Sequence, residues 1–259
     1  MIVAKFILTT EIGVSPDQFA KIDRGREKRR RKFRFCYRSD SRVLKVTMRT
    51  RIHERLHLTF YMHCLLAPLV REGNLFENLL SLGCSTFGAQ GLFEGDTGEA
   101  DSTSVPISRH LGYNYWPTLV VEAGDTKSLN QLREDMRWWF AASNHEVKIV
   151  ILTKFDHNRR CIILERWEAQ EQSSQKVMTR RRAALLRQTG LAIRRQVVTI
   201  TRDATTPKSY NVSGSFGVGF KSLFLRDRRP EEGEGEGDDV VIPVEDLQHY
   251  ADVVWRLLC

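Results

Sequence analysis

Residues 116–167 read WPTLVVEAGDTKSLNQLREDMRWWFAASNHEVKIVILTKFDHNRRCIILERW, and this stretch decides the fold. The apolar run 119–121 predicts a strand that ends in one carboxylate, Glu122. A polar turn leads into a helical segment at about 127–142, and two strand-like runs follow before Trp167. This order of strands and helix predicts an α/β fold. A strand that ends in an acid, with a helix behind it, can hold a metal ion. It is also an ordinary α/β unit.

The composition indicates a substantial core and a basic surface. The chain has 259 residues, of which 41% are hydrophobic, and its formal net charge is +8. A positive charge of this size favours a polyanionic partner and says nothing about the fold. The five cysteines are scattered and include no CxxC pair. This pattern indicates reduced thiols in an intracellular protein, and it argues against a disulfide framework or a cysteine zinc site.

The chain lacks the features of a membrane or secreted protein. Its first residues, MIVAKFILTTEIG, do not have the long apolar region and cleavage site of a signal peptide. No run approaches the ~20 apolar residues that a membrane helix needs. We therefore expect a soluble, intracellular protein without a membrane partner.

Two basic runs are candidates for contacts with nucleic acid. Residues 24–34 contain eight Lys and Arg and one acid, and residues 176–195 contain seven Lys and Arg and no acid. Like charges at this density repel one another, so residues 1–34 are expected to form a basic, flexible N-terminal arm. The run KRRRK at 28–32 reads as a nuclear-import signal, a phosphate-binding arm or a solvated flank. The first reading places the protein in the nucleus, and otherwise the cytoplasm is expected.

An early helix and two late segments complete the outline. Residues 52–70 predict a helix, with Glu54 and His57 on one face. The histidines of this helix are expected to spread around it, so that His57 is a partly exposed residue and not a metal ligand. Residues 230–239, PEEGEGEGDD, predict an acidic loop, and residues 244–258 predict an amphipathic closing helix.

Two acids stand out by their positions. Asp101 lies in EADSTS, and Glu122 follows 21 residues later, a separation that suits one β-hairpin. If the two strands pair, both carboxylates can face one cation, and ligands of this kind suit Mg²⁺. Glu54 on the early helix would complete the set. Asp101 also reads as a solvated loop acid, and Glu122 as the partner of an internal arginine, because a buried acid needs a partner.

Phosphodiester hydrolysis also needs a cation beside the attacking water. Gly124 stands two residues after the second acid, where a lysine is wanted, and Lys127 is the nearest lysine. Asp125, Thr126 and Ser128 are good N-cap residues for the following helix. Lys127 therefore has two readings, as a lysine that orients or polarises water and as part of a helix start.

Eight blocks of the sequence carry a family resemblance. They are FCYRSDSRVL, HERLH, GEADSTS, WPTLVVEAGDTKSLNQLREDMRWWFAASN, VKIVILTKFD, IILERWE, FKSLFLR and DDVVIPVEDLQHYADVVW. Together they span residues 35–258 and are similar to a group of mostly uncharacterised fungal proteins. That group resembles a divergent branch of the restriction-endonuclease-like, PD-(D/E)XK superfamily.

The resemblance implies a restriction-endonuclease-like α/β domain at 35–258, with a mixed central sheet flanked by helices. Its core is expected at about 52–168, and the extension 169–258 is expected to add a strand and a helix. The resemblance also implies the metal ligands: Asp101 matches the first acid, Glu122 the second and Glu54 an optional helix acid. Gly124 departs from the pattern, because the superfamily places its lysine there.

Two functional hypotheses follow from the resemblance. In the first, the protein is a Mg²⁺-dependent nuclease that hydrolyses DNA, with Asp101, Glu122 and Lys127 as catalytic residues. In the second, it is a catalytically inactive nuclease-fold protein that binds nucleic acid or a protein partner, which Gly124 favours. Carboxylates of Asp101 and Glu122 that converge near a lysine would favour the first hypothesis, and divergent carboxylates the second.

Overall fold

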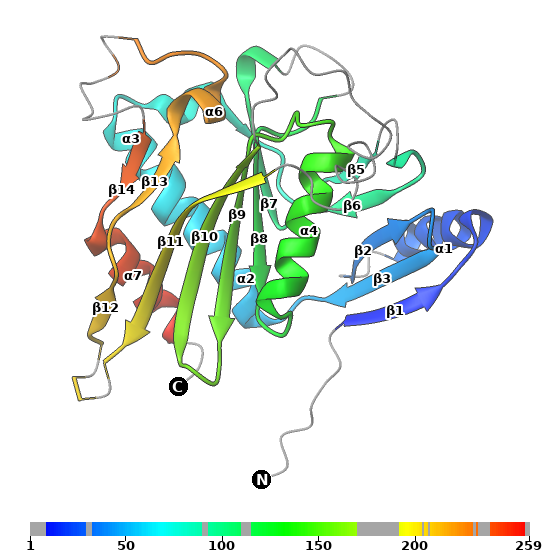
Figure 1. Ribbon diagram of the computed structural model, residues 1–259, viewed down its shortest axis with the longest axis horizontal. Helices are drawn as coiled ribbons and strands as arrows, with labels where there is room; N and C mark the ends of the chain where they lie inside the picture. Colours follow the sequence, from blue (N-terminus) through cyan, green and yellow to red (C-terminus); the bar gives the residue numbers. More distant parts are fainter. Residues whose placement is uncertain are drawn as a thin grey trace.

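The computed structural model describes residues 9–29, 33–89, 93–109, 115–169, 192–203, 205–206, 208–229, 232 and 239–256. A seven-stranded sheet lies between helices, and a five-stranded sheet with its own helix lies beside it (Figure 1). The prediction of an α/β fold with a mixed sheet flanked by helices is confirmed. None of the helices in the described part of the chain is long and apolar enough to cross a membrane.

The central sheet contains one parallel pair among antiparallel neighbours. Strands β8 and β9 run parallel because α4 (Leu129–Ala142) returns the chain across the sheet between them. The other neighbouring pairs in this sheet are antiparallel. The strands lie in the order β12 (Tyr210–Val212), β11 (Ala192–Arg202), β10 (Cys161–Ala169), β9 (Ile149–Asp156), β8 (Leu119–Gly124), β7 (Ser102–Pro106) and β4 (Leu79–Ser81).

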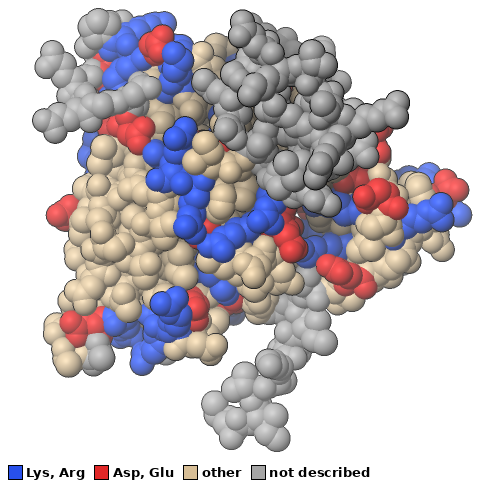
Figure 2. Space-filling view, viewed as in Figure 1, with Lys and Arg blue, Asp and Glu red and all other residues tan. Residues whose placement is uncertain are grey.

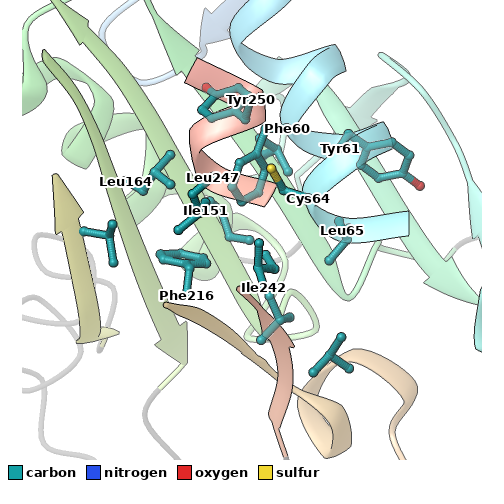
Figure 3. Close-up of a cluster of buried hydrophobic side chains, with 14 of the residues drawn as sticks. Phe60, Tyr61, Cys64, Leu65, Ile151, Leu164, Phe216, Ile242, Leu247 and Tyr250 are labelled. Atoms are coloured by element: carbon teal, nitrogen blue, oxygen red, sulfur yellow. The ribbon is translucent and has the colours of Figure 1, made fainter. Parts of the chain in front are cut away.

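The two faces of the central sheet bury different sets of side chains. Successive residues of a strand point to opposite faces, so Val120 packs in the cluster with α4 while Val121 packs in the cluster on the other face. That other face is covered by α2 (Arg51–Thr59), the π-helix η1 (Phe60–Leu66), α3 (Ala67–Arg71) and α7 (Val244–Trp255). Figure 3 shows Phe60, Ile151 and Tyr250 meeting in this second cluster.

The second sheet contains residues that were expected in a flexible arm. Its strands are β1 (Thr9–Gly13), β3 (Val43–Met48), β2 (Phe33–Arg38), β6 (Thr97–Glu99) and β5 (Thr86–Gly88), in that order. Helix α1 (Pro16–Arg29) packs on this sheet, where Phe19 stacks on Tyr37 with ring centroids 4.3 Å apart. The described part of residues 1–34 therefore forms a strand and a helix instead of the predicted flexible arm. Pairing of β1 with β3 and stacking of Phe19 on Tyr37 hold it against the second sheet. Residues 1–8 and 30–32 lie outside the described residues.

The extension after the central stretch adds strands and helices, as predicted. β13 (Phe216–Gly219) pairs with β14 (Asp239–Ile242), and α6 (Phe220–Phe224) lies directly after β13. Helix α7 begins at Val244, the residue predicted for the closing helix. Residues 170–191, which include most of the second basic run, lie outside the described residues. Most of the predicted acidic loop at 230–239 lies outside them as well. The short 3-10 helices are η2 (Leu75–Asn78) and η4 (Ile107–Arg109).

Candidate functional site

Glu122 lies on β8 in the middle of the protein. All six residues of this strand are buried, and Glu122 itself is 2% exposed. Its side chain faces α4, where the indole N–H of Trp139 donates to Oε1 over 2.8 Å. The other carboxylate oxygen, Oε2, is buried and has no hydrogen-bond partner. A buried carboxylate with an unpaired oxygen is unusual, because leaving such a group unsatisfied costs free energy.

Asp101 reaches the same place from the turn between β6 and β7. Strand β7 pairs with the antiparallel β8 so that Ser102 lies opposite Val121. Asp101, the residue before Ser102, therefore lies next to Glu122, the residue after Val121. The backbone N–H of Ala123 donates to Asp101 Oδ2 over 2.8 Å, and His53 Nε2 lies 2.6 Å from Oδ1. The predicted hairpin therefore forms, and it brings the two acids together.

The cation that both acids share is Arg34. Its Nη1 donates to Asp101 Oδ1, and its Nη2 donates to the carbonyl oxygen of Glu99. Nη2 also lies 3.7 Å from Glu122 Oε1. Arg34 is 4% exposed, so this is a buried ion-pair group of one guanidinium and two carboxylates. Glu122 is thus the partner of an internal arginine, which was one of its readings from the sequence.

The buried group shifts the pKa of its members in different directions. Burial opposes the charge of Arg34, but Asp101 and Glu122 outweigh it and raise the pKa of the guanidinium. Burial likewise opposes ionisation of Asp101, but Arg34 and His53 hold its pKa well below the usual range. For Glu122, burial dominates and raises the pKa to about 7, with Arg34 acting against it and Asp101 adding to it. Arg34 thus stabilises the charge of Asp101 more than that of Glu122.

Lys127 lines the same pocket as Glu122 but forms an ion pair with another acid, Asp135. Its Nζ donates to Asp135 Oδ2 over 2.8 Å, and Lys45 Nζ lies 3.5 Å from Oδ1 of the same carboxylate. The helix start has the capping box expected of an N-cap, with Ser128 and Gln131 bonding each other's backbone N–H groups. The cap reading of this segment is therefore confirmed. Lys127 is held against α4 by Asp135.

A pocket of about 20 Å³ lies beside these groups. It is lined by Arg34, Glu122 and Lys127 among others, and it has room for about one water molecule. A second pocket of about 190 Å³ shares Lys45 and Asp135 with it. Glu122, whose Oε2 is unpaired, lines the first pocket, so a water bound there can supply the missing hydrogen bond.

Gly124 lies close to the side chain of Leu132. A Cβ atom on Gly124 would lie 2.6 Å from Cδ1 of Leu132, a distance that real Cβ atoms essentially never show. Leu132 is fully buried on α4, in the cluster that faces this side of the sheet. A lysine at Gly124 would therefore require the buried side chain of Leu132 to shift.

The α2 residues lie apart from this pocket's lining. The carboxylate of Glu54 is 3.6 Å from Arg49 Nε and 3.6 Å from His57 Nε2, and the side chain is 33% exposed. His53 and His57 are both buried, so the prediction of a partly exposed His57 is wrong. Residues four apart on a helix differ in direction by only about 40°, which places the two histidines on one face. Burial lowers the pKa of His57.

Several described arginines of the two basic runs are paired with acids. In the first run, Arg34 is buried in the site and Arg26 pairs with Glu99. At the end of the second run, Arg194 and Arg195 are 47% and 48% exposed but pair with acids of β10. Figure 2 shows Lys and Arg side chains in a band across the middle of one face.

Arg34 leaves little opportunity for Mg²⁺ at the predicted acids. The carboxylate of Asp101 already contacts three protein N–H groups, those of Arg34, His53 and the backbone of Ala123. The guanidinium of Arg34 also lies between the two carboxylates. Mg²⁺ requires near-octahedral oxygen ligands and keeps several waters, and the pocket of about 20 Å³ beside Glu122 has no space for them. The residues present do not fit a hydrated Mg²⁺ while Arg34 is in place.

Comparison with known proteins does not assign the chain to a family. No model of a protein family matches it, and no curated protein has a matching sequence. Its function is therefore inferred from the side chains of the site.

Proposed function

We propose that this chain is a nuclease-like protein that binds nucleic acid and does not cleave it through a metal ion. The observation that carries the proposal is the guanidinium of Arg34, which lies beside both Asp101 and Glu122. The β7–β8 hairpin that brings the acids together supports the nuclease-like part of the proposal. The mixed sheet flanked by helices supports it as well.

The chemistry of arginine explains why cleavage is not expected. A metal ion activates hydrolysis by lowering the pKa of a bound water and by neutralising the developing charge on the phosphate. Arg34 supplies a positive charge but stays protonated, so it cannot generate hydroxide or accept a proton from water. Lys127 is engaged by Asp135, and Gly124 has no side chain.

Cleavage assays provide the test of this proposal. Supercoiled plasmid and single-stranded DNA are incubated with wild type and with Glu122→Ala in Mg²⁺ or Mn²⁺. We expect no metal-dependent cleavage by either protein, because the metal position is filled by Arg34. Cleavage by the wild type that Glu122→Ala abolishes would contradict the proposal and favour an active nuclease.

Binding to nucleic acid is expected to depend on salt and on exposed arginines. Arg194 and Arg195 are half-exposed on β11, and each cation that contacts a phosphate contributes about −0.9 to the slope of log K against log salt concentration. Replacing both with alanine should reduce that slope by about 2 in magnitude, measured by fluorescence anisotropy of labelled DNA or RNA at several salt concentrations.

A matched variant controls for the loss of charge. Arg71→Ala with Arg256→Ala removes the same charge from α3 and the end of α7, where both arginines are exposed and each is paired with one acid. This control should leave the slope unchanged. Equal slopes for all three proteins would show that β11 does not contact phosphates, and absence of binding by the wild type would contradict the binding function itself.

A further inference from the structure

The start of α2 carries a pattern of which only His53 contacts the Arg34 site, through Asp101. Residues 53–57 read HERLH, so two histidines stand four positions apart with a glutamate after the first. On a helix this H-E-x-x-H spacing puts both imidazoles on one face, and it occurs in zinc-binding helices. Thr50 caps the helix by accepting the backbone N–H of His53, which fixes the first turn and the directions of its side chains.

We propose that the chain binds a divalent transition-metal ion through His53, Glu54 and His57. One ligand atom from each residue lies within 4.8 Å of one from each of the other two. His57 Nε2 and Glu54 Oε1 are 3.6 Å apart. Tetrahedral Zn²⁺ with ligands at 2.0–2.1 Å places neighbouring ligand atoms roughly 3.4 Å apart, so this pair already has nearly the required separation.

Two of the atoms that would bind the ion make no hydrogen bond. His57 Nε2 and Glu54 Oε1 are both buried and face each other, and the one other charged group near Glu54 Oε1 among the ion pairs of the described residues is Arg49, whose Nε lies 3.6 Å away. His57 is 3% exposed, so water does not readily satisfy its free nitrogen. An unpaired nitrogen and an unpaired carboxylate oxygen at this separation are the donors that a cation between them would satisfy together.

Each histidine is oriented by a partner on its other nitrogen. His57 Nδ1 lies 2.9 Å from Ser102 Oγ, and His53 Nε2 lies 2.6 Å from Asp101 Oδ1. When those nitrogens donate their hydrogens, the lone pairs are on His57 Nε2 and His53 Nδ1. Metal-binding histidines almost always have such an outer partner, often a carboxylate, which fixes the tautomer and the ring direction. Asp101 and Ser102 therefore act as positioning residues, supplied by adjacent positions of one strand end.

The donor set identifies the class of ion. Two imidazoles and one carboxylate suit Zn²⁺ and its neighbours among the transition metals, whereas Mg²⁺ prefers oxygen ligands alone. Three protein ligands leave the fourth position of a tetrahedral ion to a water molecule. This site uses a different cation and different ligand atoms from the Arg34 group, and the two are joined through the contact of His53 with Asp101. It does not depend on nucleic-acid binding.

Cobalt and zinc titrations test the proposal on the full chain. The protein is treated with a chelator, dialysed and titrated with Co²⁺, whose visible absorption reports a tetrahedral environment, and Zn²⁺ is then added to displace it. We expect one equivalent of Co²⁺ to bind and Zn²⁺ to remove the absorption. Losing an outer partner of a ligand typically costs about 10- to 100-fold in affinity, so His57→Ala should weaken binding by at least about 100-fold.

Two further variants separate metal binding from folding and from surface binding. Glu54→Gln changes a partly exposed side chain, so it should keep the fold, which circular dichroism verifies. It should still weaken Co²⁺ binding at least tenfold, because even the loss of an outer partner of a ligand costs about that much. His63→Ala removes an exposed histidine of η1 and should bind Co²⁺ like the wild type. Absence of stoichiometric binding, or equal affinity in the wild type and folded Glu54→Gln, would overturn the proposal.

Discussion

Replacing Arg34 with alanine is expected to destabilise the protein by about 3–5 kcal/mol. The guanidinium is buried against Asp101 and Glu122, and its removal leaves the Asp101 carboxylate in the interior with one fewer donor. An uncompensated buried charge costs far more than the loss of an exposed ion pair. Urea-induced unfolding of wild type and Arg34→Ala, followed by circular dichroism at neutral pH, gives the difference in free energy of unfolding.

The neighbouring Arg38 provides a matched control. It lies on the same strand, four residues from Arg34, but it is partly exposed and sits 3.9 Å from Asp96 while stacking over Trp138. Arg38→Ala should cost less than about 1–2 kcal/mol, since its charge is partly solvated. Similar losses in the two variants would show that Arg34 is an ordinary surface cation in solution and would remove the basis for its proposed role.

Replacing Glu122 with glutamine is expected to change how stability varies with pH. Burial raises the pKa of Glu122 to about 7, above its usual value of 4.5. Between these two values the folded protein binds a proton that the unfolded chain releases, so this group's contribution to stability falls as pH rises through the window. Each unit of pKa shift corresponds to about 1.4 kcal/mol, so the loss is roughly 3 kcal/mol by about pH 7.

The variant isolates this contribution from opposing ones. His57, whose pKa is lowered by burial, makes stability rise with pH below its usual value of 6.5, which partly masks Glu122 in the wild type alone. The stability of Glu122→Gln minus that of the wild type should therefore grow by roughly 3 kcal/mol from pH 4.5 to 7 and then level off. Thermal unfolding across this range measures it, and a difference that does not vary with pH would mean that Glu122 titrates normally.

Much of the central sheet follows from local sequence signals. The strand from the apolar run before Glu122 and the helix start, for which Asp125, Thr126 and Ser128 are the N-cap candidates, are determined by residues that are close in the sequence. The structure has the strand, and Ser128 is the N-cap. The pairing of Asp101 and Glu122 could also be predicted, because a short separation between two strands favours a hairpin.

The buried arginine could not be predicted in the same way. Its partner Asp101 lies 67 residues further along the chain, and Arg34 stands at the end of a dense run of surface charges. A signal was nevertheless present, because the aromatic residues Phe33, Phe35 and Tyr37 recur at every second position, as in a strand. That alternation, weighed against the charge run, assigns Arg34 to a strand and not to an arm.

The most direct test of the account is a calorimetric titration of the wild type and Glu122→Gln with Mg²⁺. If Arg34 fills the position between Asp101 and Glu122, both proteins should show the same absence of stoichiometric Mg²⁺ binding. Stoichiometric binding by the wild type that is lost in Glu122→Gln would contradict the account, because it would mean that a metal ion displaces the guanidinium and uses the two carboxylates.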